Sequence, residues 1–164
     1  MARSIIGVMG AGEGAAAADL ANAVRLGELL ARDGWVILTG GRDAGVMREV
    51  NRGAHRVPSC LTVGVLPSTS SPVAPDVDII IVTDMHNARN NINVLSSRVV
   101  IACGNGGPGT ASEIALALKA GKAVILLAMD DLSRAFYQRL GGNKVLVVSS
   151  PEEAAAAARQ FLPQ

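Results

Sequence analysis

The chain is poor in aromatic residues, histidine and cysteine, and each shortage excludes a class of function. Its 164 residues include one tryptophan, one tyrosine and two phenylalanines, so few rings are present on which nucleic-acid bases could stack. The formal net charge of +1, without a run of lysine or arginine, also argues against nucleic acid. No apolar run approaches the roughly 18 residues that cross a bilayer, and the first four residues begin no apolar leader. We therefore expect a soluble, cytoplasmic protein with neither nucleic acid nor a membrane as its partner.

The cysteines and histidines are too scattered to form an obvious site. Cys60 and Cys103 stand alone, and His55 and His86 do not share a metal-ligand spacing with them. Isolated cysteines in a cytoplasmic chain usually behave as small apolar residues. We expect no disulfide and no metal ion held by protein side chains.

Short apolar runs alternate with helical stretches along the whole chain. Strands are expected at residues 4–9, 35–38, 61–66, 78–82, 98–102, 123–127 and 144–148, and helices at 15–33, 45–55, 87–97, 110–120, 132–140 and 151–161. Runs such as 78–82 and 123–127 do not alternate in polarity, which is typical of parallel strands buried on both faces. The pattern predicts one α/β domain over residues 1–164, Rossmann-like and doubly wound. Its mainly parallel sheet should have about seven strands, with helices on both faces.

Ten of the eighteen glycines lie in three segments, residues 10–14, 40–45 and 104–110, each directly after an expected strand and before a helix. Ligands of an open parallel sheet bind outside the carboxyl ends of its strands. Glycine there lets a ligand approach backbone N–H groups, and the N-terminus of the next helix favours an anion. One such loop could be a plain turn, whereas three favour a shared anionic ligand, most simply a phosphate.

The first glycine segment also fits the G-x-G-x-x-A pattern of dinucleotide-binding loops, through Gly10, Gly12 and Ala15. That function needs an acidic residue near the end of the second strand, to hold the ribose hydroxyls. Thr39 stands at that position. A nicotinamide or flavin dinucleotide is therefore disfavoured.

Two polar groups beside the glycine segments have two interpretations each. Thr110 and Glu113 could form a capping box at the start of a helix, or Glu113 could enter the crevice as a general base or sugar-hydroxyl acceptor. Arg89, Asn90 and Asn93 could be a solvated first turn. Arginine near a helix N-terminus opposes the helix dipole, however, and a bound anion would offset that cost.

These motifs together resemble the LOG-like proteins, a superfamily often mislabelled as lysine decarboxylases. The marks of that family are a P-G-G-x-G-T-x-x-E segment, a preceding helix that carries arginine, and an upstream G-G…G-x-M loop. They correspond here to residues 105–113, to Arg89 with Asn90, and to residues 40–47. The resemblance extends from residue 5 to about 148 and implies the family's Rossmann-like fold.

Some members of the superfamily cut the N-glycosidic bond of cytokinin nucleoside 5′-monophosphates. The resemblance would assign that phosphoribohydrolase chemistry to Arg89, which binds the phosphosugar, and Glu113, which stabilises the ribosyl centre or activates water. The chain departs from those enzymes at Asn105, where proline is usual, and at Asn90, where lysine commonly follows the arginine. Loss of that lysine removes a positive charge from the phosphosugar site.

The short chain and the Arg89-Asn90-x-x-Asn93 pattern are more similar to another branch, the molybdenum cofactor carrier proteins. That resemblance implies a protein that binds, protects and transfers molybdenum cofactor to molybdoenzymes, without catalytic residues of its own. The pterin dithiolene would hold the molybdenum, so no protein metal ligand is expected. The implied cofactor-binding residues are Gly10, Ala11, Gly12, Gly40, Gly41, Arg89, Asn90, Asn105, Gly106, Gly107, Gly109, Thr110 and Ser112.

Two further expectations remain open. A nucleotide-sensing module that binds without turnover is a third possible function. The family resemblance and alanine-rich helices such as residues 111–120, which permit close helix packing, favour a homodimer or homotetramer.

Overall fold

A computed structural model describes residues 3–162 of the chain. Met1 and Ala2, where no leader was expected, and residues 163–164, at the end of the expected domain, lie outside the described residues. The strands are β1 (Ile5–Gly10), β2 (Val36–Thr39), β3 (Leu61–Leu66), β4 (Ile79–Val82), β5 (Val99–Cys103), β6 (Val124–Leu127) and β7 (Val145–Val148). The described α-helices are α1 (Ala17–Arg32), α2 (Gly45–Ala54), α3 (Arg89–Ser96), α4 (Pro108–Lys119), α5 (Asp131–Gly141) and α6 (Pro151–Arg159).

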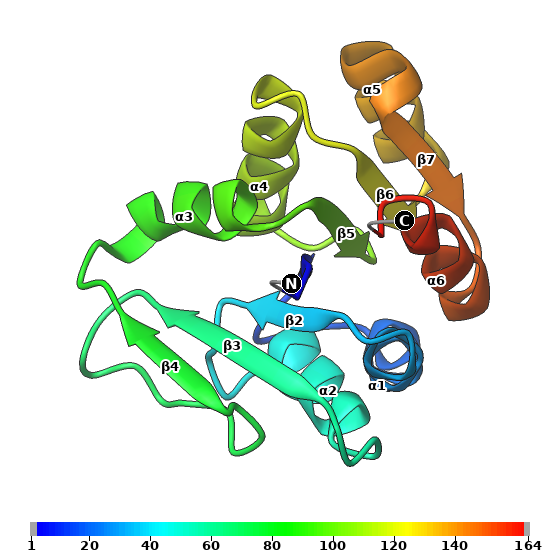
Figure 1. Cartoon of the computed structure of the whole chain (residues 1–164). Coiled ribbons are helices and arrows are strands. Elements are labelled where there is room, and N and C mark those ends of the chain that lie inside the picture. The colour runs from blue at the N-terminus through cyan, green and yellow to red at the C-terminus, as the bar shows by residue number, and fades with distance from the viewer. Residues whose placement is uncertain (1–2, 163–164) are drawn as a thin grey trace.

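All seven strands are parallel and form one sheet in the order β4-β3-β2-β1-β5-β6-β7. Helices α1, α2 and α6 cover one face, and α3, α4 and α5 cover the other (Figure 1). The predicted Rossmann-like, doubly wound α/β fold is confirmed. The chain winds outward from β1 to β4 and then crosses back to β5, so β1 and β5 flank the point where the winding reverses, where such sheets bind ligands.

The sheet centre is buried as the sequence predicts. In β6 all four residues have no exposed surface, and Val99, Val100 and Ile101 of β5 are equally buried. The two faces carry separate apolar clusters, one around Trp35 and Leu30 on the α1 side and one around Ile114 on the α4 side. This rigid centre positions the loops that follow β1, β2 and β5.

Strand β4 contradicts the prediction of burial on both faces. Its four apolar residues, Ile79–Val82, each remain 44% to 50% exposed. The strand forms the outer edge of the sheet beside β3 (Figure 1). Its sequence resembles that of β6, but no described helix packs closely on either face of β4, so its side chains stay open to solvent.

Helices α1 and α2 pack through two glycines. A β-carbon on Gly27 would overlap the carbonyl oxygen of Val50, and one on Gly53 would overlap that of Val24. Glycine is therefore required at both positions for the two helix backbones to approach so closely. Among the described helices, none is both long and apolar enough to cross a bilayer.

Candidate functional site

A pocket of about 360 Å³ opens at the carboxyl ends of β1, β2 and β5, where the three glycine segments meet. This volume lies within the range of small-molecule sites. Ten of the predicted binding residues line the pocket: Gly10, Ala11, Gly12, Gly40, Arg89, Asn90, Gly106, Gly107, Gly109 and Thr110. The order of the central strands brings these distant segments of the chain to one place.

The other three predicted residues, Gly41, Asn105 and Ser112, lie outside the lining. Gly41 has a φ of +71° and faces Gly64, whose Cα would be 2.8 Å from a β-carbon on Gly41. The Asn105 side-chain oxygen accepts a hydrogen bond from the backbone N–H of Asp130, at 2.8 Å. Gly41 and Asn105 therefore contact other parts of the chain and not the pocket space.

Ser112 acts as a support for a residue that does line the pocket. Its hydroxyl accepts a hydrogen bond from Asn90 Nδ2 at 2.8 Å and donates one to the carbonyl oxygen of Gly109 at 2.7 Å. Two hydrogen bonds therefore connect the beginning of α3 with the first turn of α4. They hold the Asn90 side chain against the glycine segment that opens α4.

Two arginine side chains, Arg42 and Arg89, also line the pocket. A β-carbon on Gly12 would lie 2.6 Å from Arg42 Nη2, and one on Gly40 would lie 2.9 Å from Arg89 Nη2. The glycines are therefore needed to seat the guanidinium groups, in addition to exposing backbone N–H groups. Arg42 is a pocket residue that the sequence analysis did not predict. The available signal in the sequence was its place directly after the Gly40–Gly41 pair.

The pocket lining holds four charged side chains, Arg42 and Arg89 together with Glu13 and Glu113. Among residues 3–162, no carboxylate lies within ion-pair distance of Arg42 or Arg89. Arg89 is buried, and its Nε has no hydrogen-bond partner among these residues. Burial lowers the pKa of Arg89, the charge of Glu113 raises it, and that of Arg42 lowers it. An anionic ligand would satisfy the buried N–H and offset the repulsion between the arginines.

Glu113 faces the pocket instead of capping a helix. Helix α4 begins at Pro108, after the N-cap Gly107, and that cap has no side-chain hydrogen bond. The capping box is therefore wrong, because proline at the first helical position starts the helix two residues before Thr110. The buried Glu113 accepts a hydrogen bond through Oε1 from Asn93 Nδ2, at 2.9 Å.

The environment of Glu113 favours its neutral form. Burial raises the pKa of the Glu113 carboxyl, against the opposing effects of the Asn93 hydrogen bond and the charge of Arg89. A buried acid beside an arginine could bind a sugar hydroxyl or donate a proton. Arg89 and Glu113, the two residues of the hydrolase hypothesis, therefore share one pocket.

The described lining of the pocket includes no aromatic side chain. Its apolar contacts come from Val8, Met9, Met47 and Pro67. A ring-bearing ligand would therefore rest on aliphatic and thioether surface, while the arginines and backbone N–H groups bind its anionic part. This division suits a ligand with one strongly charged end.

Comparisons with known proteins show the family of the chain and the solved structures that it resembles. The profile of the SLOG cluster4 family matches residues 3–155. The structure of the molybdenum cofactor binding protein from the phototrophic bacterium Rippkaea orientalis is 53% identical, with a TM-score of 0.94 and 99% of each chain covered. The molybdenum cofactor carrier protein of Chlamydomonas reinhardtii is 46% identical, with a TM-score of 0.91 over 99% of this chain and 100% of that one. An uncharacterised protein of Archaeoglobus fulgidus is 46% identical over 122 residues, 74% of this chain and 78% of its own.

Proposed function

The chain belongs to the SLOG cluster4 family, and from this membership we propose that it is a molybdenum cofactor carrier. It binds the cofactor as cargo, protects it and passes it to molybdoenzymes. The observation that carries the proposal is the pair of pocket arginines, Arg42 and Arg89, without a protein carboxylate within ion-pair distance among the described residues. The terminal phosphate and the molybdate oxygens supply the anionic partners that these two guanidinium groups do not find among the described side chains.

The binding role of each group follows from its position. Arg89 and Arg42 neutralise the phosphate, with the otherwise unpartnered Arg89 Nε as one donor. Backbone N–H groups of Gly106, Gly107 and Gly109, at the beginning of α4, add donors at a helix N-terminus. Asn90, held by Ser112, and Thr110 contribute side-chain hydrogen bonds. The pterin dithiolene holds the molybdenum, so the protein need supply no metal ligand in this pocket.

Anaerobic purification from a host that makes molybdenum cofactor tests this function directly. The protein should carry molybdenum and pterin in equal amounts and restore activity to a cofactor-free molybdoenzyme. Arg89→Gln should lower the bound molybdenum by at least about tenfold, because a charged hydrogen bond contributes roughly 1.5–3 kcal/mol. Arg98→Gln removes an equal charge from an exposed position outside the pocket and should bind normally. Protein that neither retains the cofactor nor reactivates the enzyme would refute the proposal.

The placement of Arg89 and Glu113 in one pocket supports a second candidate, the nucleoside 5′-monophosphate phosphoribohydrolase. Incubation with AMP and N6-substituted analogues separates the two functions. A carrier releases no free base, whereas the hydrolase releases base and loses that activity in Glu113→Ala. Calorimetric titration with the same nucleotides would identify a sensor that binds without turnover.

We infer in addition that the chain forms homodimers or homotetramers. The support is the exposed apolar surface of β4 and a stripe on α5, formed by Leu132, Phe136 and Leu140. These three side chains are spaced by four residues, so they share one face of the helix. Exposed apolar surface of this kind marks sites of protein contact.

A further inference from the structure

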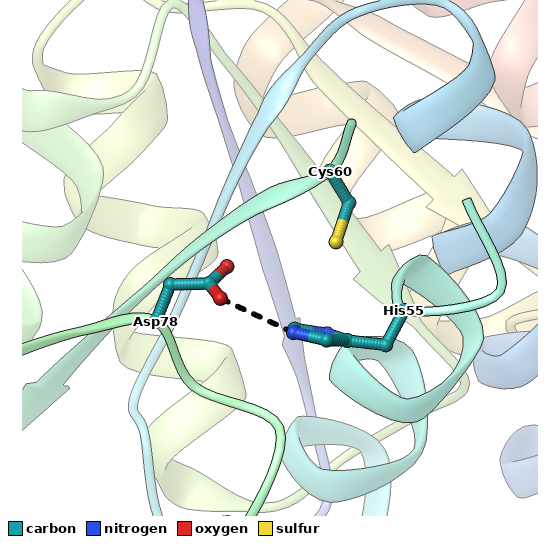
Figure 2. A group of neighbouring side chains, drawn as sticks. All are labelled: His55, Cys60 and Asp78. Carbon is teal, nitrogen blue, oxygen red and sulfur yellow. Dashed lines mark hydrogen bonds and ion pairs between the residues drawn. The ribbon is translucent and has the colours of Figure 1, made fainter. Parts of the chain in front are cut away.

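Three potential metal ligands meet at the end of the sheet opposite the pocket (Figure 2). His55 follows α2, Cys60 immediately precedes β3, and Asp78 immediately precedes β4. Because β3 and β4 are parallel, their first residues lie at the amino end of the sheet, and the pocket lies at the carboxyl ends. This cluster, named here the His55–Cys60–Asp78 cluster, is therefore separate from the proposed cofactor pocket.

The geometry is close to that of a metal site. The donor atoms of the three side chains all lie within 4.8 Å of one another, and His55 Nε2 is 3.2 Å from Asp78 Oδ1. Ligands of a tetrahedral zinc ion sit about 2.0–2.3 Å from it and hence about 3.3–3.8 Å apart. The histidine and the aspartate are within about 0.1 Å of that range. The Cys60 sulfur, which points toward the same space in Figure 2, needs to move by at most about 1 Å.

Neighbouring hydrogen bonds orient two of the ligands. His55 Nδ1 lies 3.2 Å from the carbonyl oxygen of Asn51, and this contact leaves Nε2 directed at the cluster. Asp78 Oδ2 accepts hydrogen bonds from the backbone N–H and the hydroxyl of Thr62, at 2.7 and 3.0 Å, so Oδ1 remains available. Metal-binding histidines and carboxylates characteristically have such outer partners.

Metal binding at this cluster requires the Cys60 thiol to lose its proton. Burial raises the pKa of the Cys60 thiol, and the negative charges of Asp78 and Asp76 raise it further. A divalent ion would reverse that effect. On binding, the thiol would lose its proton to the buffer while a sulfur–metal bond forms, with no change in oxidation state.

We propose that the His55–Cys60–Asp78 cluster binds a borderline-soft divalent cation of the Zn²⁺ type, with water in the fourth position. Thiolate and imidazole ligands select such ions over magnesium or calcium. The bound ion would connect the end of α2 to the beginnings of β3 and the exposed edge strand β4. This departs from the expectation of no protein-held metal, which considered the histidines and cysteines by chain spacing and left Asp78 out.

Zinc titration of the chelator-treated full chain, in competition with a chromophoric chelator, tests the site. We expect one zinc ion per chain and a higher melting temperature with zinc present. Cys60→Ser should weaken zinc binding by at least about 100-fold, since loss of an outer-shell partner alone costs about 10–100-fold. Cys60 makes no side-chain hydrogen bond within residues 3–162, so this variant should fold normally. His55→Gln provides a second variant with the same expected loss.

Two controls distinguish this site from adventitious binding. His86→Asn removes the other histidine, at a positive φ that asparagine tolerates, and should bind zinc as the wild type does. Co²⁺ should give the near-ultraviolet charge-transfer absorption of a cobalt–thiolate bond, absent in Cys60→Ser. Failure to bind zinc at micromolar concentration, or equal affinity in the wild type and Cys60→Ser, would overturn the proposal. Neither result depends on whether the pocket carries molybdenum cofactor.

Discussion

At the scale of single residues, the pocket depends on the space that glycines leave because they have no β-carbon. Gly12 and Gly40 make room for the guanidinium groups of Arg42 and Arg89. Gly107 and Gly109 differ from these, since a β-carbon on either would meet no protein atom within 4 Å. Both line the pocket, so the space beside them is the space that a ligand would use.

Gly109→Ala separates binding from folding. Gly109 lies in the first turn of α4 without a positive φ, and alanine is a better helix former by about 1 kcal/mol. The free variant should be as stable as the wild type or slightly more stable in thermal melts. Its copurified molybdenum should fall by at least about tenfold, because the added methyl occupies ligand space. Unchanged molybdenum content would show that the ligand does not approach this turn.

Glu113→Gln tests the burial of the pocket carboxyl. The amide keeps an oxygen that accepts from Asn93 Nδ2 but cannot ionise. Because burial raises the pKa of Glu113 above its ordinary 4.5, the unfolded chain ionises first as pH rises, and the wild type loses stability above that value. We expect the ligand-free variant to be more stable than the wild type by about 0.5–2 kcal/mol at pH 7, which is the usual gain from one stabilising substitution.

Melting curves between pH 4 and pH 8 check this expectation. The difference between Glu113→Gln and the wild type should shrink as pH falls through 4.5, because below that value both states of the wild type bind the proton. Asp130→Asn, at the exposed N-cap of α5, is a contrasting control: the Ser133 N–H lowers the pKa of Asp130, so this variant should be less stable than the wild type at pH 7 and the difference should shrink as pH falls. A wild type as stable as Glu113→Gln at pH 7 would contradict the burial effect.

At the scale of elements, the contact of α1 with α2 depends on backbone approach more than on side-chain size. Gly27 of α1 lies against the carbonyl oxygen of Val50 in α2, and Gly53 of α2 lies against that of Val24 in α1. These carbonyl groups belong to the helix backbones, so they cannot move without disturbing the helices. These helices flank the first two glycine segments, since α1 follows residues 10–14 and α2 follows residues 40–44. Their close packing therefore determines how near the two segments lie.

Gly53→Ala should change stability in the opposite direction to Gly109→Ala, although both replace a helical glycine by alanine. A methyl on Gly53 would overlap the backbone of Val24, and overpacking of this kind costs about 1–3 kcal/mol or more. Denaturant unfolding of the two variants measures the contrast, with Gly109→Ala as the matched control. Equal stability of Gly53→Ala and the wild type would mean that the helices separate at little cost.

At the scale of the whole molecule, apolar surface remains on two separate elements. The β4 edge lies at one end of the sheet, and the α5 stripe lies beside β7 at the other (Figure 1). Leu132, Phe136 and Leu140 of the stripe are between 49% and 82% exposed. A tetramer with dihedral symmetry needs two different self-complementary faces, and these two surfaces could supply them.

Charged substitutions on each surface test the assembly by light scattering. Ile80→Asp on β4 and Phe136→Asp on α5 should each lower the mass by about half, and the double variant should be monomeric, because a charge at an apolar interface opposes association. Ala115→Asp, on the exposed side of the alanine-rich helix 111–120, should leave the mass unchanged. A monomeric wild type would refute self-association. Loss of assembly in Ala115→Asp would instead place the interface on α4.

Much of the fold could be predicted because its signals are local. The order of strands and helices follows from apolar runs and helical periodicity, and the observed ends differ from the predicted ones by a residue or two. The site was less predictable, because neither Arg42 nor Glu113 has a local pattern that separates a pocket residue from a surface or capping residue. In the sequence, Arg42 cannot be distinguished from a surface arginine. Glu113 has the spacing of a capping residue, and only the observed start of α4 at Pro108 shows that it does not cap the helix.

The sequence by itself determined the fold class, the three glycine segments and their preference for an anion. Those properties depend on residue types at short spacing, which the chain carries directly. The tertiary structure decided which residues meet: Arg42 with Arg89, Glu113 with Asn93, and His55 with Cys60 and Asp78. It also decided that Ile79–Val82 lies open at the sheet edge while Val124–Leu127 is buried. Two similar runs differ in this way because burial depends on the neighbours that the fold supplies.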